Sequence, residues 1–480
     1  MSAVDTTELR ARFARRLSEL YGREVPAYNT LVEVSQEVNR GVLARDGRAA
    51  ERLGAIDRVT AERHGAIRVG TAEELSQVAR IFGALGMQPT GFYDLRDAHP
   101  QPVPMVSTAF RPIEREELAR NPFRVFTSML VPQDRRFFDE DLEERLTRFL
   151  AARRLFPDEL LALADRAEEE GELSETHAAR FLELAAASFA LSSDPVDRGW
   201  YAELERISGV AADIGGVTTT HINHLTPRVL DIDDLYASMQ ARGVQMIDQI
   251  QGPPRWHGPD VLLRQTSFRA LAEPRAFREE NGNIGQGKLR VRFGEVEARG
   301  IALTPGGRDL YDRLVAEVDR RTADAPDRSR QEVAAEVWTA GLADSETALA
   351  RQDLGFFTFL PAERAPDGTE PPRDLAGLLA GGWLVAEPIV YEDFLPRSAA
   401  GIFASNLSDR GEMDASQGEA LRDADWLSEA IGRPIRVPEQ VYAEQRAESL
   451  TRAAAALGIG GGIVIGQEPA GPQVPGGATR

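Results

Sequence analysis

Apolar residues recur at helical spacing in the first part of the chain and predict two helices, over residues 7–21 and 29–43, which form a packing layer. Residues 139–191 are rich in Leu, Ala, Glu and Arg at the same spacing and predict a helical insertion. Residues 308–450 are also mainly helical in pattern, with an interruption by an apolar, glycine-bearing region at 375–403. Much of the chain is therefore expected to be helical.

Between these helical stretches the period changes to that of β-strands. Residues 62–70 suit a strand, and Thr71 and Glu74 form a capping box that predicts a helix reaching about residue 85. Strand patterns then follow at residues 89–95, 103–110 and 123–131. The predicted order of elements is βαβββ.

The same order of elements returns in the second half of the chain. Residues 218–230 suit a strand and residues 232–242 a helix, and further strands are predicted at 244–250, 261–271 and 288–303. The two stretches share little letter-for-letter similarity, so the repeat is one of element order. We therefore expect an α+β fold in which two βαβββ units form a central mixed sheet surrounded by helices.

This pattern divides the chain into successive regions. We expect an N-terminal helical layer (1–60), a first βαβββ unit (61–138) and a helical insertion (139–200). A second βαβββ unit (201–307), a mainly helical region that closes the site (308–457) and a flexible Gly/Pro-rich tail (458–480) follow.

Composition and charge exclude several classes of function. The formal net charge of -20 repels phosphate backbones and anionic lipids, so we expect neither a nucleic-acid nor a membrane partner. The chain lacks a signal-peptide pattern at its start and an apolar run long enough to cross a bilayer, so a cytoplasmic protein is expected. The absence of cysteine excludes disulfides, thiolate metal sites and iron–sulfur clusters, and no Gly-x-Ser-x-Gly motif supports a serine hydrolase.

A metal site in this chain must use His, Asp or Glu as ligands. His64 lies in the opening strand of the first unit, His224 in the opening strand of the second, and Glu295 in the closing strand of the second. A lone strand histidine is more often structural, but the matched placement favours a shared ion within the central sheet. Two imidazoles and one carboxylate form a facial triad, which suits iron(II) and leaves positions for a bidentate substrate and dioxygen.

Two neighbouring residues compete with these ligands. His221 and His224 differ by an odd number of residues, so they face opposite sides of a regular strand, and His221 is interpreted as a residue that supports the ligands from behind or lies at the surface. Glu295 and Glu297 share one strand face, and spacing alone does not separate them. Glu297 is therefore an alternative carboxylate ligand.

Arg68 lies four residues after His64 and hence on the same strand face, roughly 13 Å further along. An arginine near a metal that chelates a 2-oxo acid is suited to clamp a carboxylate with its bidentate fork. A surface ion pair explains the same residue equally well.

Two other motifs are interpreted as structural. Residues 282–288 have phosphate-loop spacing, but Leu289 replaces the Ser or Thr that would hold magnesium, so we predict a turn between strands. Three clustered acidic residues are interpreted as the start of a helix, where the helix dipole favours negative charge. They are Asp231, Asp233 and Asp234.

The chain resembles the 2-oxoadipate dioxygenase/decarboxylase family, also called hydroxyglutarate synthases, which are distant members of the vicinal-oxygen-chelate superfamily. The resemblance runs from about residue 8 to residue 457 and is carried by several separated segments in order. These are EVPAYNTLVE, ERHGAIRVGTAEEL, FRVFTS, INHLTPRVLDID, LLRQTSF, RFGEVEARGIALTP and VYEDFLPRSAAGIF.

The resemblance assigns roles to particular residues. It implies that His64, His224 and Glu295 are the iron ligands, which would settle both ambiguities, and that Arg68 binds a substrate carboxylate as a catalytic residue. It also implies that FLPRSAAGIF closes the pocket near Ser398. Arg397 departs from the small apolar residue expected there, and an inward-pointing side chain would add a second carboxylate clamp or alter the chain-length preference.

The implied reaction is the iron(II)-dependent oxidation of 2-oxoadipate by O2 to 2-hydroxyglutarate and CO2, a step of lysine breakdown. The expected cofactor is Fe(2+), and the expected partners are a small 2-oxo dicarboxylate and O2. One alternative is a non-redox lyase or isomerase of the same superfamily that uses Zn(II), Ni(II) or Mn(II) as a Lewis acid. Another is a non-enzymatic binding protein in which the histidines are structural. The sequence does not indicate the oligomeric state.

Overall fold

A five-stranded mixed sheet forms the centre of the computed structural model, which describes residues 3–98, 102–289, 292–363, 370–395 and 417–465. The strand order is β3-β4-β5-β2-β8. β2 runs parallel to β5 and antiparallel to β8, and the remaining pairs are antiparallel. The strands are β2 (Arg63–Val69), β3 (Gln88–Asp94), β4 (Met105–Arg111), β5 (Arg124–Leu130) and β8 (His224–Pro227). The predicted α+β class is confirmed.

The first predicted strand–helix–strand series is present in the chain. β2 leads into α4 (Ala72–Gly83), which begins with the predicted capping box of Thr71 and Glu74. The strands β3, β4 and β5 then follow in order, with the short helix α5 (Arg115–Arg120) between β4 and β5. Because β5 lies beside β2, the four strands of this series form one continuous sheet.

The second series is less regular than the sequence predicts. β8 leads into α11 (Ile232–Ala241), and β9 (Leu263–Phe268) pairs antiparallel with β12 (Gly294–Arg299). A bridge between Arg228 and Glu297 joins the end of β8 to β12. The predicted strand at 244–250 was wrong, since that segment makes a single isolated bridge to β9, from Met246 to Phe268, and lies between two positive-φ glycines, Gly243 and Gly252.

The predicted strand at 288–303 was also wrong as a single element. Its first residues belong to β11 (Ile284–Leu289), which forms a hairpin with β10 (Glu273–Arg278). The other edge of β10 pairs in parallel with β7 (Val196–Asp197). Gly282 has a φ of 80° in the turn of this hairpin, but residues 284–288 of the phosphate-loop-like segment belong to β11, so the predicted turn between strands is correct only for the start of that segment. Asp231 caps α11 by accepting a hydrogen bond from the backbone of Asp234, as predicted for a helix start.

Helices cover both sides of the sheet. The N-terminal helices and residues 158–188 of the insertion pack on the face that carries Ile67 and Val69, together with α4, whereas apolar residues of 140–151 and 201–214 pack with Ala66 and Phe126 on the opposite face. Both predicted N-terminal helices are confirmed, and the insertion contains three helices and the strand β6, which pairs with β1. The elements are β1 (Ala3–Asp5), α1 (Thr6–Glu24), α2 (Pro26–Asp46), η1 (Gly47–Glu51), α3 (Ile56–Ala61), α6 (Glu140–Ala151), α7 (Asp158–Glu170), β6 (Glu172–Ser174), α8 (Glu175–Ser188), α9 (Arg198–Ile207) and α10 (Gly209–Gly215).

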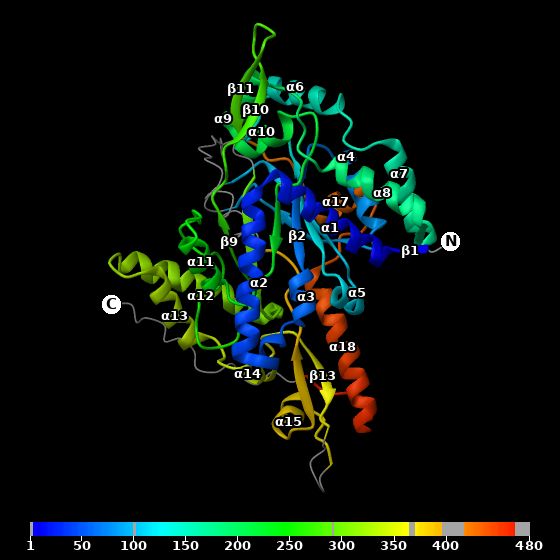
Figure 1. Ribbon diagram of the computed structural model, residues 1–480. Coiled ribbons are helices and arrows are strands. Elements are labelled where there is room, and N and C mark those ends of the chain that lie inside the picture. The colour runs from blue at the N-terminus through cyan, green and yellow to red at the C-terminus, as the bar shows by residue number, and fades with distance from the viewer. Residues whose placement is uncertain (1–2, 99–101, 290–291, 364–369, 396–416, 466–480) are drawn as a thin grey trace.

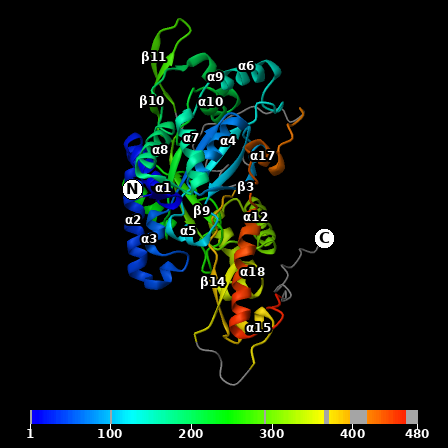
Figure 2. The same cartoon turned by 90° about the vertical axis from the view of Figure 1, so that its right-hand side faces the viewer.

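The C-terminal region forms a separate apolar core below the sheet. Figure 2 shows α18 beside the β13–β14 pair and α15. The elements are α12 (Pro305–Asp324), α13 (Arg330–Gly341), α14 (Glu346–Arg351), β13 (Phe357–Pro361), α15 (Leu375–Ala380), β14 (Leu384–Pro388), α17 (Ala424–Ile431) and α18 (Pro438–Leu457). Val464 of the predicted tail pairs with Asp374, and residues 466–480 of that tail lie outside the described residues. No helix in the described ranges is long and apolar enough to span a membrane.

Candidate metal centre

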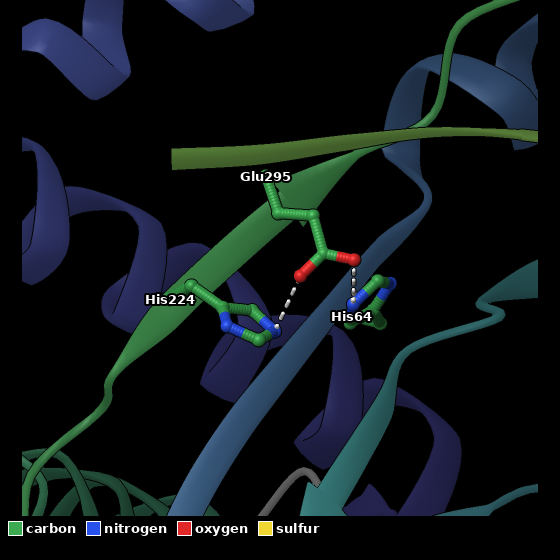
Figure 3. Close-up of side chains that lie close together, drawn as sticks. All are labelled: His64, His224 and Glu295. Carbon is green, nitrogen blue, oxygen red and sulfur yellow. Dashed lines mark ion pairs between the residues drawn. The ribbon is translucent and has the colours of Figure 1, made fainter. Parts of the chain in front are cut away.

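Three predicted ligands from distant parts of the chain meet at one point. His64 comes from β2, His224 begins β8, and Glu295 lies near the start of β12, and one ligand atom of each lies within 4.8 Å of the others. Figure 3 shows the carboxylate of Glu295 with one oxygen toward each imidazole. The Nε2 atoms of His64 and His224 lie 3.8 Å and 3.3 Å from these oxygens.

The spacing and burial of these atoms fit a bound divalent ion. Two ligands that each lie about 2.1 Å from one ion at a right angle are about 3 Å apart, close to the separations seen here. All three residues are buried, and neither ring nitrogen of His224 has a hydrogen-bond partner in the described part of the chain. Buried polar nitrogens without partners are costly, and coordination to a metal ion would satisfy one of them.

The electrostatics of the site also favour a cation. Burial raises the pKa of the Glu295 carboxyl well above its usual range, and the neighbouring Glu297 adds to the effect. Burial, His64 and Arg68 hold the pKa of His224 well below its usual value, which keeps this imidazole neutral. Neutral imidazoles and a carboxylate destabilised by burial are the forms that a divalent ion would bind and stabilise.

The structure separates Glu297 from the ligand set. Its carboxylate lies 2.8 Å from Nδ1 of His64, on the ring nitrogen opposite the one that faces Glu295. Burial alone would raise the pKa of Glu297, but Arg299, His64 and Arg124 together hold it well below its usual range. An ionised carboxylate on the far nitrogen of a metal-binding histidine fixes the orientation and tautomer of its ring. Glu297 therefore lies behind His64, not at the ion.

Glu297 belongs to a group of linked ion pairs that we call the buried charge network. Arg124 lies at its centre and contacts Glu62 at 2.8 Å, Glu297 at 3.2 Å, and also Glu392. All members except Arg58 are buried. The network consists of Arg58, Glu62, Arg111, Arg124, Arg228, Glu297, Arg299, Glu392 and Asp393.

Arg68 lies on the same sheet face as His64, as predicted, and is buried rather than at the surface. Its guanidinium pairs with Asp213, which also accepts a hydrogen bond of 2.8 Å from the amide of Asn223. The side chain of His221 lies 3.1 Å from that amide and is buried, so this histidine is close to the site without joining the three ligands. The expectation of a surface ion pair for Arg68 was therefore wrong.

Aromatic rings enclose the three ligands. The ring of Phe394 lies 5.1 Å from that of His64, and the ring of Phe293 lies 5.3 Å from that of His224. Phe394 belongs to the segment FLPRSAAGIF, so the described start of that segment reaches the site. Arg397 and Ser398 lie outside the described residues.

Sequence reasoning missed Asp213 and the acidic residues of the buried charge network. Asp213 is the lone acidic residue in the small and apolar stretch GVAADIGG, and Glu392 and Asp393 follow the apolar run PIVY. An acidic residue within an apolar stretch signals a buried, paired carboxylate. That signal identifies such residues as buried without identifying their arginine partners.

Comparison with known proteins gives consistent results over almost the whole chain. The family model described as 2-oxoadipate dioxygenase/decarboxylase matches residues 13–406. A relative of that name from Mycobacterium tuberculosis is 53% identical over 439 residues, covering 92% of this chain and 96% of the relative. Another of that name from Pseudomonas putida is 40% identical over 467 residues, covering 95% and 98%.

The fold is also similar to that of a solved structure. The crystal structure of the hydroxyglutarate synthase from Pseudomonas putida in complex with 2-oxoadipate matches with a TM-score of 0.80 and 37% sequence identity. The match covers 96% of this chain and 100% of that one.

Proposed function

The chain belongs to the 2-oxoadipate dioxygenase/decarboxylase family, and we propose that it oxidises 2-oxoadipate with O2 to 2-hydroxyglutarate and CO2 at one iron(II) ion. The observation that carries the proposal is the convergence of His64, His224 and Glu295. Atoms balance in this reaction, since CO2 leaves with both oxygens of the C1 carboxylate, and the two oxygen atoms of O2 enter 2-hydroxyglutarate, one in its new carboxylate and one in its hydroxyl.

His64, His224 and Glu295 would hold the iron. Bound iron(II) would supply a redox centre with coordination positions for both the 2-oxo acid and O2. Glu297 holds the ring of His64 from behind, and the buried surroundings exclude water that would compete for the open positions.

Arg68 would bind the carboxylate of the substrate that is distant from the iron. Asp213 keeps the guanidinium in a buried position, which fixes its orientation before the substrate arrives. Preorganised charge of this kind lowers barriers by positioning, because little side-chain freedom is lost on binding. We also propose that Arg397 and Ser398 contribute to the substrate site, as the family resemblance implies.

We further propose that the frame of the site is a pair of βαβββ-like units, of which the first ends with β5 and the second, which lacks the strand predicted at 244–250, ends with β12. Each unit would then supply a histidine from its first strand, and the second would add Glu295 from its last. We expect the enzyme to act in lysine breakdown in the cytoplasm.

The test is an oxygen-electrode assay of the iron-loaded protein with 2-oxo dicarboxylates of different chain length. His224→Ala should abolish iron binding and oxygen uptake. His221→Ala is a matched control, because it removes a buried imidazole three residues away that is not among the ligands. Normal oxygen uptake by His224→Ala would refute the ligand assignment. Turnover of 2-oxoadipate without oxygen uptake would instead favour a non-redox lyase or isomerase, and absence of stoichiometric iron after anaerobic reconstitution would favour a binding protein.

A further inference from the structure

A row of polar side chains crosses the sheet beside the metal centre. Arg68 on β2 lies in register with Ser128 on β5, Ser128 with Ser107 on β4, and Ser107 with Tyr93 on β3. Residues directly opposite each other on paired strands project to the same face, so this row shares the face of His64. His64 lies in register with Arg124, at the other end of the same two strands.

A row of smaller and apolar residues separates the two polar rows. Ala66 lies between His64 and Arg68 on β2 and is in register on one side with Phe126, which is in register with Ala109, and on the other side with the metal ligand His224. The methyl groups of the two alanines project little from the sheet, on either side of the ring of Phe126, which contacts Phe394. A hydrocarbon chain could therefore lie over Ala66, with one end at the metal ligands and the other at the row of Arg68.

The two serines form a buried hydrogen-bonded pair. Ser107 donates a hydrogen bond of 2.9 Å to the hydroxyl of Ser128, and both residues are almost fully buried. Because Ser128 accepts this bond, its own proton is available as a donor, and the described residues include no acceptor for it. A buried hydroxyl proton next to a guanidinium is suited to donate to an anion.

The length of the span fits a short dicarboxylate. Arg68 and Ser128 lie roughly 13 Å along the strands from the row of His64 and roughly 7 Å from the row of Ala66 and His224, at about 3.3 Å per residue. An extended six-carbon dicarboxylate separates its terminal carbons by about 6 Å, taking about 1.2 Å per bond. The imidazole and guanidinium extend from the backbone and can lean toward each other, which closes the remaining distance.

We propose that Ser128, supported by Ser107, forms with Arg68 a subsite for the distal carboxylate, and so determines the preference for 2-oxo dicarboxylates over 2-oxo monocarboxylates. This inference rests on the proposed function, since it assumes that the substrate chelates an ion held by the three ligands. It goes further by assigning the hydroxyl of Ser128 as the donor that completes the carboxylate site.

The experiment measures anaerobic binding of two ligands to the iron-loaded full chain by calorimetry. One ligand is 2-oxoadipate, and the other is 2-oxohexanoate, which has the same chain length but no distal carboxylate. Ser128→Ala should weaken 2-oxoadipate binding about 10- to 100-fold, the effect of removing a hydrogen bond to a charged group. Binding of 2-oxohexanoate should change less than about threefold. Ser107→Ala should weaken 2-oxoadipate binding alone, by a few-fold.

Thr127→Val is the matched control. Thr127 precedes Ser128 on β5, projects to the opposite face, and carries a buried hydroxyl for which the described residues offer no partner. This variant should bind both ligands as the wild type does. A thermal melt of each variant checks folding, and Ser107→Ala tests the proposal if Ser128→Ala does not fold.

Unchanged binding of 2-oxoadipate to Ser128→Ala, or an equal loss for both ligands, would overturn the proposal. Failure of the proposed function would look different. It would appear in the wild type, as an absence of oxygen uptake with 2-oxoadipate, whereas the binding comparison needs no turnover.

Discussion

Replacing Glu297 by glutamine should weaken metal binding without removing a ligand. Glu297 contacts Nδ1 of His64 at 2.8 Å, and glutamine keeps the shape of the side chain while it loses the charge. The imidazole of His64 then loses the anion that orients it and increases its basicity. Carboxylates in this position typically contribute 10- to 100-fold in metal affinity, which corresponds to about 1.4 to 2.7 kcal/mol.

Glu62→Gln provides a control in the same network. Glu62 and Glu297 are both buried, both contact Arg124 and Arg299, and neither is a proposed metal ligand. Each variant leaves buried arginines with one carboxylate fewer, which destabilises a protein by up to about 3–5 kcal/mol. Only Glu297→Gln also removes the partner of His64. The two variants should therefore lose similar stability and differ in metal affinity.

Anaerobic competition for iron(II) against a chromophoric chelator measures the affinity, and thermal melting of the metal-free proteins measures the stability. We expect Glu62→Gln to stay within about threefold of the wild-type affinity, because its contacts do not reach an imidazole. If both variants lost affinity equally, Glu297 would act only through the packing of the network. If Glu297→Gln bound iron as the wild type does, the role assigned to the carboxylate behind His64 would be wrong.

Other predictions concern stability. Removing the metal with a chelator should lower the melting temperature. Iron(II) at 100 times its Kd should restore about 2.7 kcal/mol of unfolding free energy, measured by thermal melting. An unchanged melting temperature would contradict a bound ion. Gly294→Ala should lose about 1–3 kcal/mol in urea unfolding, because the new Cβ would lie 1.8 Å from the ring of Phe268, whereas Gly41→Ala has open space around it and should lose nothing. Asp213→Asn should lower the melting temperature, because it removes the charged partner of Arg68. Added 2-oxoadipate should raise the melting temperature of this variant more than that of the wild type, and an equal rise in both proteins would contradict the prediction.

The strand pattern of the sequence was sufficient to place His64 and His224 on opening strands. These strands, β2 and β8, turned out to be neighbours in one sheet, which brings the two histidines together. Alternation along a strand could not separate Glu295 from Glu297, because both project to the same face. What separates them is the ring of His64, which presents one nitrogen to each carboxylate. That distinction depends on a side-chain orientation that no local pattern encodes.

The partners of the buried arginines were equally beyond local reasoning. Arg68 and Asp213 are 145 positions apart, and Arg124 and Glu392 are 268 positions apart. At residues 244–250 the reverse holds: a local strand pattern is present, but the structure does not form the strand. The apolar alternation of this segment predicts a strand, but with positive-φ glycines on both sides it makes a single isolated bridge to β9.

Charge balance connects the site to its proposed ligands. The buried charge network and Glu295 together contain five arginines and five carboxylates, and Arg68 is neutralised by Asp213. An added divalent cation would leave two uncompensated positive charges in a buried region, which is unfavourable. A substrate with two carboxylates restores neutrality, whereas a monocarboxylate leaves one positive charge. Burial of the network therefore favours the same ligand class as the serine pair beside Arg68, through long-range electrostatics instead of a direct hydrogen bond.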